Sequence, residues 1–163
     1  MDAKSAIKET FGISNMVLNS YIGDLTDAEL MRRPGVGCNH VAWQLGHLIS
    51  SECGLLNAIL AGAAPQLPAG FEQKHSKENT GSDSPKDFLT KQEYVDLANK
   101  VHEAVVACLD AFPESKLDDP SPEHLRNMFP TMGSIFLLIA THSMMHAGQI
   151  VPLRRELGKP VVI

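Results

Sequence analysis

Four long segments of this sequence repeat their apolar residues at intervals of three and four, which places those residues on one face of an α-helix. The segments span about residues 2–22, 40–60, 90–112 and 131–157. A helix with one apolar face is stable only when that face packs against another element. Four such segments therefore predict an all-α protein in which long helices pack on one another.

Polar residues mark where several of these helices begin. Thr90 and Glu93 have the spacing of a capping box, and Asn39 is a suitable N-cap for the second long helix. A second capping-box pair predicts an additional short helix at about residues 26–32.

Two long connections separate the predicted helices. Residues 62–88 are rich in glycine, proline and polar residues, which predicts a loop or a mobile flap. Residues 113–130 contain four prolines, and Ser121-Pro122-Glu123 predicts one short helix there. We therefore expect a four-helix bundle with long crossover connections. Because composition does not change along the chain, residues 1–163 are expected to form a single domain.

Charge and composition exclude several classes of protein. The 14 Lys and Arg residues against 19 Asp and Glu residues give a net charge of −5, without the basic surface that a general nucleic-acid binder needs. The longest unbroken apolar run, residues 135–140, is far shorter than the roughly 20 residues that span a bilayer. The three cysteines form no CxxC motif and are typical of free thiols. These features predict a soluble, cytoplasmic protein that binds neither nucleic acid nor membrane.

The last helix carries polar residues on its apolar face. At about 100° per residue, His142, His146 and Gln149 fall in the same stripe as Ile135 and Ile150. His142 and His146 are four residues apart, so both imidazoles can bind one metal ion. Alternatively, each histidine donates a hydrogen bond to a carbonyl or carboxylate in the core, and spacing alone does not decide between these interpretations.

A third ligand is needed, because two imidazoles bind a divalent ion weakly. The second helix offers His40 and His47, seven residues apart on one face, which flanks the apolar stripe. His47 lies deeper in the helix and is favoured by a small margin. The remaining histidines lie in connections or beside the stripe of the third helix: His75, His102 and His124.

Two segments, NHVAWQLGHLISSE and THSMMHAGQIVPLRRELG, resemble the DinB/YfiT-like superfamily of metalloenzymes. The resemblance covers nearly the whole chain. It implies a four-helix bundle, typically a homodimer, in which three histidines bind one divalent metal ion. By position, these ligands fall on His47, His142 and His146.

Three imidazoles leave a coordination position open, as in catalytic zinc sites. Zinc, nickel and iron all suit imidazole, so the metal is not determined. The open position could lower the pKa of a water, which predicts a hydrolase, or bind a thiol as thiolate, which predicts a transferase. The resemblance favours the second reading, because relatives include transferases and isomerases that use low-molecular-weight thiols such as bacillithiol and mycothiol. We therefore expect a small-molecule substrate and a thiol cosubstrate; no catalytic residue is identified.

A di-iron bundle is excluded, since the sequence has only one Glu-x-x-His match, Glu72 to His75. The main alternative is a non-enzymatic metal-binding or stress-related helical dimer, which would fill the space beside the metal with side chains. Five further residues lie near the candidate ligands. We expect Met144 and Met145 to be core residues, Trp43 to be core or to line the pocket, Gln149 to orient a ligand or to form a core hydrogen bond, and Cys38 to be a plain loop thiol rather than a fourth ligand.

Overall fold

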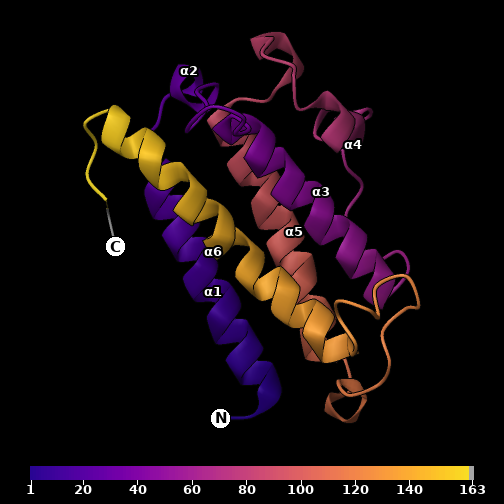
Figure 1. The fold of residues 1–163 in the computed structure, drawn as a ribbon. Helices are drawn as coiled ribbons and strands as arrows, with labels where there is room; N and C mark the ends of the chain where they lie inside the picture. The colour runs from indigo at the N-terminus through magenta and orange to yellow at the C-terminus, as the bar shows by residue number, and fades with distance from the viewer. Residues whose placement is uncertain (162–163) are drawn as a thin grey trace.

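Four long helices dominate the computed structural model, which describes residues 1–161 (Figure 1). They are α1 (Ala3–Ile22), α3 (Val41–Ile59), α5 (Lys91–Ala111) and α6 (Met132–Glu156). Within residues 1–161 there is no β-strand, only an isolated bridge between Pro120 and Thr131. The all-α prediction is therefore confirmed.

The connections contain short helical turns. These are α2 (Asp27–Leu30), α4 (Phe71–Lys74), η1 (Lys77–Asn79), η2 (Pro85–Asp87) and η3 (Glu114–Lys116). The segment 62–88 thus holds three short helical elements, which the prediction of a loop or flap did not include. The short helix expected at Ser121-Pro122-Glu123 is absent from the described structure, where residues 123–128 form turns instead.

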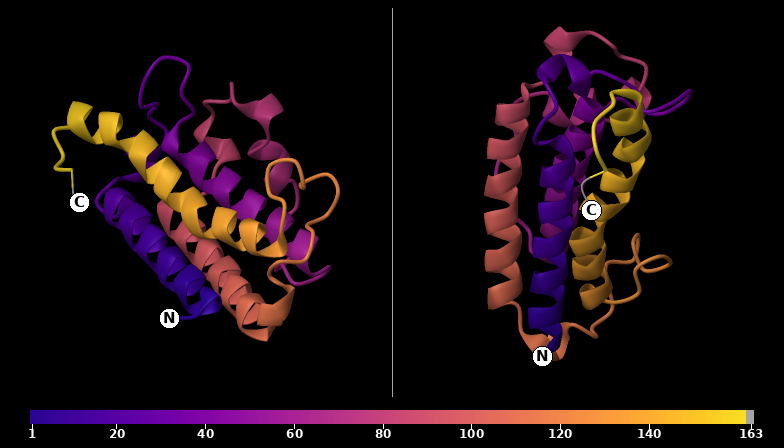
Figure 2. Two further views of the ribbon diagram at one scale, coloured as in Figure 1. Left: turned by 60° about the horizontal axis from the view of Figure 1, so that its bottom comes forward. Right: turned by 90° about the vertical axis from the view of Figure 1, so that its left-hand side faces the viewer.

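The long helices run in two parallel pairs. The ends of α1 and α6 lie together, because Arg154 donates hydrogen bonds to the Tyr21 carbonyl at 2.7 Å and to the Asp24 carboxylate. The start of α1 lies at the end of α5, where Lys4 donates to the Asp110 carbonyl at 2.8 Å. Consequently α1 and α6 run in one direction, and α3 and α5 in the other (Figures 1 and 2).

Among the connections within residues 1–161, only one crosses the length of the molecule. Residues 60–90 lead from the far end of α3 back to the start of α5, whereas residues 112–131 join neighbouring ends of α5 and α6 (Figure 1). The expectation of two long crossovers was therefore wrong for the second connection. The return segment, called the crossover below (residues 60–90), lies against α3.

The N-cap of α3 differs from the prediction. His40, not Asn39, caps the helix: its Nδ1 accepts a hydrogen bond from the Trp43 backbone N–H at 3.0 Å. The Asn39 carbonyl instead accepts from the Gln44 side chain at 2.8 Å. A neutral imidazole nitrogen can accept the capping hydrogen bond, as an amide oxygen would. Because His40 takes the N-cap position, the helix begins one residue later than predicted. Both predicted capping boxes, at Thr26 and Thr90, are present.

The core lies between the four long helices and contains mainly their aliphatic side chains. Helix α6 is long and apolar enough to cross a membrane by length and composition alone, but half of its most apolar window is buried against its neighbours. Core helices of soluble proteins commonly have this composition. The position of α6 between α1 and α3 accounts for it here.

Candidate metal centre

Three histidines from two distant segments meet between α3 and α6. His47 comes from α3, and His142 and His146 from α6; their potential ligand nitrogens all lie within 4.8 Å of one another. The ring centroids are 4.9 to 5.5 Å apart. Two nitrogens bound to one zinc ion at about 2.0–2.1 Å are about 3.4 Å apart, so small side-chain rotations suffice to bring them to one ion. The cluster includes His47 and excludes His40.

His146 is held in one orientation and one tautomer by Gln44. The Gln44 Nε2 group donates to the Asn39 carbonyl at 2.8 Å, which directs Oε1 toward His146 Nδ1 at 3.0 Å. An amide oxygen accepts only, so His146 carries its proton on Nδ1 and leaves the Nε2 lone pair free. Metal-bound histidines are characteristically oriented by such a partner.

His142 has a nitrogen that the protein leaves without a partner. Its side chain is 8% exposed, and nothing within residues 1–161 forms a hydrogen bond with Nδ1. An unpaired buried polar atom costs about 1–3 kcal/mol. A cation bound by this nitrogen would remove that cost, so these residues fit a divalent metal ion.

His47 is the most accessible ligand candidate, and Trp43 covers one face of it. The two rings stack at a centroid distance of 4.9 Å and an interplanar angle of 7°. Trp43 is itself buried, and its indole N–H donates to the Ser76 carbonyl of the crossover at 3.2 Å. The two interpretations of Trp43 are therefore both correct, because it is a core residue that also walls the cluster.

Burial keeps the three imidazoles neutral. Together with a smaller effect of the neighbouring histidines, it lowers the pKa of His142 to about 4 and that of His146 to about 3. The pKa of His47 is also lowered, first by burial and then by the positive charge of Lys77. Only a neutral imidazole has a lone pair for a metal, so all three are in the binding form at neutral pH.

The other histidines have different surroundings. His75 donates from Nδ1 to the Phe71 carbonyl at 2.8 Å, so its Nε2 accepts from the Tyr94 hydroxyl, also at 2.8 Å. This ring lies over Gly46, where a Cβ would be only 2.0 Å from it. His75 therefore fixes the crossover to α3. His40 caps α3, His102 contacts Glu52, and His124 is exposed.

Several neighbours of the cluster are not where the sequence placed them. Gln149 is exposed, and so are Met144 and Met145, which were expected in the core. The inward face of α6 is shared between α1 and α3, and it buries Ser143 and Ala147 instead. Cys38 is exposed and lies outside the histidine cluster.

Gln44 was not identified from the sequence. It lies three residues before His47, on the same side of α3, and is 1% exposed. An amide three residues from a candidate ligand within an otherwise apolar run is the signal that could have indicated it.

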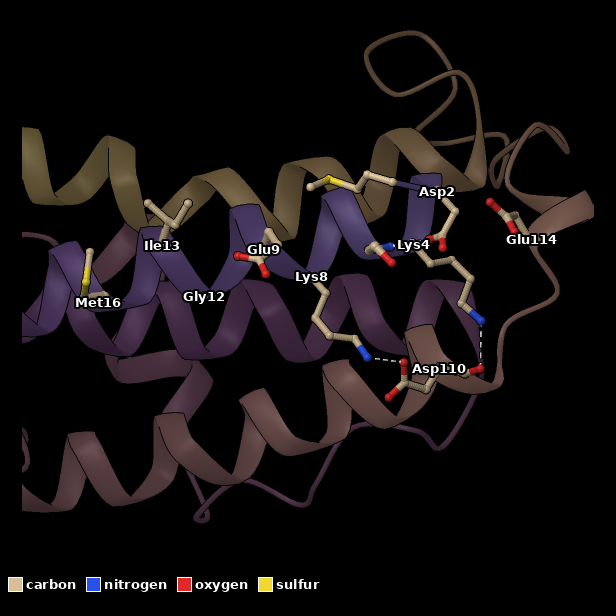
Figure 3. Close-up of a pocket in the computed structure, with 11 residues that line it drawn as sticks. Asp2, Lys4, Lys8, Glu9, Gly12, Ile13, Met16, Asp110 and Glu114 are labelled. Atoms are coloured by element: carbon tan, nitrogen blue, oxygen red, sulfur yellow. Dashed lines mark hydrogen bonds and ion pairs between the residues drawn. The ribbon is translucent and has the colours of Figure 1, made fainter.

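A hollow of about 790 Å³ on the surface lies elsewhere, along the outer face of α1 and the end of α5 (Figure 3). Its lining includes Asp2, Glu9 and Glu114, and Lys8 forms an ion pair with Asp110 there. It shares no residue with the histidine cluster, and its exposed charges face solvent. We do not assign the function to it.

The fold and the cluster define a helical protein with a candidate three-histidine metal centre. Residues 11–150 match the family model of the DinB superfamily, and the chain belongs to this superfamily. The expected family membership is thereby confirmed.

A solved structure shares the fold. The crystal structure of "the conserved protein of locus" from Enterococcus faecalis is similar with a TM-score of 0.73 at 18% identity, over 98% of this chain and 99% of that one. At this identity the similarity demonstrates the fold alone. A search among curated proteins found no significant match.

Proposed function

We propose that this protein is a metal-dependent enzyme in which His47, His142 and His146 bind one divalent ion. Members of the DinB superfamily are associated with metals, and this chain brings three imidazoles within 4.8 Å. The proposal rests on the observation that the three imidazoles are ready to bind a metal ion. Each imidazole is neutral, His146 is held in one tautomer, and His142 Nδ1 lacks any partner among the described residues.

The three residues would supply three of four ligands, and the fourth position would be left for substrate. A bound zinc, nickel or iron ion would act there as a Lewis acid and lower the pKa of a coordinated group. Gln44 holds the His146 ring, and Trp43 holds the His47 ring by stacking. Trp43 and the crossover also shield one side of the cluster from water.

An enzyme must let its substrate reach the metal ion, whereas a non-catalytic module would fill the space beside the ion with side chains. His142 and His146 are buried, whereas His47 is only half-buried. The partly exposed edge of His47 is therefore the side from which a substrate would have to approach the cluster. We propose a thiol as the cosubstrate, because an imidazole-bound ion would stabilise a thiolate at neutral pH. The thiol would release its proton to solvent, its sulfur would form a bond to the carbon of an electrophile, and the electrophile's leaving group would depart as an anion.

The metal assignment is tested by elemental analysis of the purified protein. His146→Ala should lose the ion bound by the three histidines, whereas His124→Ala, which removes an exposed histidine, should retain it. Circular dichroism should show both variants to be as helical as the parent. Equal metal content in the two variants would refute the assignment.

The reaction is tested with a low-molecular-weight thiol and an activated electrophile such as a nitro-substituted aryl halide, which releases halide when the thiolate adds to the ring. Adduct formation should stop on addition of a chelator and return when zinc is restored. Chelator-sensitive cleavage of an ester without thiol would identify a hydrolase instead. No turnover by a fully metal-loaded protein would favour the non-enzymatic module. The expected homodimer and cytoplasmic location stay predictions, to be tested by light scattering and cell fractionation.

A further inference from the structure

A second group of polar side chains lies inside the molecule, separate from the three histidines. Each of the four long helices contributes one member: Asn15, Glu52, His102 and Ser143. All four line one small cavity of about 30 Å³. Glu52 is 2% exposed and Ser143 is 1% exposed, so the cavity lies deep between the helices.

The contact between Glu52 and His102 is not a satisfied ion pair. Glu52 Oε2 and His102 Nε2 are 3.6 Å apart, beyond the range of a hydrogen bond. Burial raises the pKa of Glu52 to about 8, although Ser143 donates a hydrogen bond that opposes the rise. Burial also lowers the pKa of His102 to about 4, so both groups are neutral at pH 7. Neither electrostatics nor a hydrogen bond explains why they face each other.

Asn15 adds an oxygen that lacks a donor. The residue is 8% exposed, and its Oδ1 forms no hydrogen bond with any described residue. The cavity wall therefore presents a carboxyl, an imidazole and an amide oxygen, and each of these groups has a lone pair that a cation could bind once Glu52 is ionised. Such a set calls for a species with positive charge or with donor hydrogens.

The distance between Glu52 Oε2 and His102 Nε2 suits two ligands of one metal ion. Two ligand atoms bound to one divalent ion at about 2.0–2.2 Å lie about 3.0–3.5 Å apart, close to the separation of Glu52 and His102. The cavity exceeds the roughly 10–15 Å³ that one water needs. His102 is half-buried, and Asn19 of α1 and Val95 of α5, which also line the cavity, are not buried, so the cavity lies closest to solvent on this side.

We propose that Glu52, His102 and Asn15 form a second divalent-cation site in the centre of the four long helices. The ion would hold Glu52 as a carboxylate, bind the free nitrogen of His102 and satisfy Asn15 Oδ1. This site does not depend on the function proposed for the three histidines, with which it shares no residue. Water in the cavity is the alternative occupant, and the test distinguishes it.

The test counts ions. Protein stripped by a chelator is dialysed against Zn²⁺, and bound zinc is measured per chain. The parent should bind two ions, and the double variant His142→Ala/His146→Ala should bind one. Glu52→Gln, which keeps the side-chain shape, should also bind one. Glu103→Gln changes an exposed carboxylate of α5 and should leave the count at two.

A parent that binds one ion per chain, with that ion lost in the double variant, would overturn the proposal and indicate that the cavity holds water. So would a Glu52→Gln variant that binds as many ions as the parent. If Glu52→Gln does not fold, His102→Asn in the double-variant background gives the answer: the single remaining ion should be lost, and its retention would contradict the site. If the double variant binds as many ions as the parent and Glu52→Gln binds one fewer, the second site stands and only the metal site of the function proposed above is contradicted.

Discussion

Replacing Gln44 by leucine should weaken metal binding at the three histidines although Gln44 is not a ligand. The substitution removes the acceptor 3.0 Å from His146 Nδ1, so the imidazole loses the partner that fixes its tautomer and orientation. Loss of such a partner typically lowers metal affinity 10- to 100-fold, or about 1.4–2.7 kcal/mol. Because the leucine is similar in volume, the helix packing should persist.

The affinity is measured by competition with a chromophoric zinc chelator at pH 7. Gln149→Leu provides the control, since Gln149 is an exposed glutamine of α6. The parent and Gln149→Leu should have equal affinities, and that of Gln44→Leu should be lower by at least tenfold. Leaving the Asn39 carbonyl without its donor also costs stability, so urea unfolding of the metal-free proteins must accompany the titration. An affinity of Gln44→Leu within twofold of the parent would refute the reasoning.

Three further predictions concern stability. Gly46→Ala should lower the free energy of unfolding by about 1–3 kcal/mol in urea, because its Cβ would lie 2.0 Å from the His75 ring; an unchanged midpoint would contradict the close approach. Tyr94→Phe removes the hydroxyl that donates to buried His75 and should cost about 1–3 kcal/mol by the same measurement, with no loss if that hydrogen bond is unimportant. A hydrogen bond from Arg154 lowers the pKa of Asp24 in the folded protein below the usual value of 3.8. The ionised Asp24 side chain therefore stabilises the folded protein above pH 3.8, and this stabilisation is lost as the pH falls through the pKa of Asp24 in the folded protein. Asp24→Asn should therefore be less stable at pH 7 by no more than about 1 kcal/mol, since Asp24 is half-exposed, and the difference should vanish in strong acid; a constant difference would be inconsistent with this linkage.

The long helices could be predicted from the sequence because their signals are local. Apolar spacing and the capping boxes at Thr26 and Thr90 depend on residues within a few positions of one another. The start of α3 was misplaced by one residue because an imidazole was not considered as a cap. The path of residues 112–131 could not be predicted, since loop length does not determine which ends of the helices lie together.

The histidine cluster was predicted only in part by residue spacing. Spacing identified His142 and His146, and the family resemblance was needed to choose His47 over His40. The partners that hold the rings come from contacts between helices and from the crossover, which periodicity does not reveal. Gln149 was expected on the buried face of α6 but is exposed. The prediction assumed that α6 buries one apolar stripe, whereas α6 packs against two neighbouring helices and buries a different set of residues.

X-ray absorption at the zinc edge, on protein loaded with one equivalent of zinc, tests the central claim most directly. The account predicts a first shell of nitrogen and oxygen with the multiple scattering of three imidazoles, reduced to two in His47→Ala. A sulfur ligand, or a parent spectrum with fewer than three imidazoles, would contradict it.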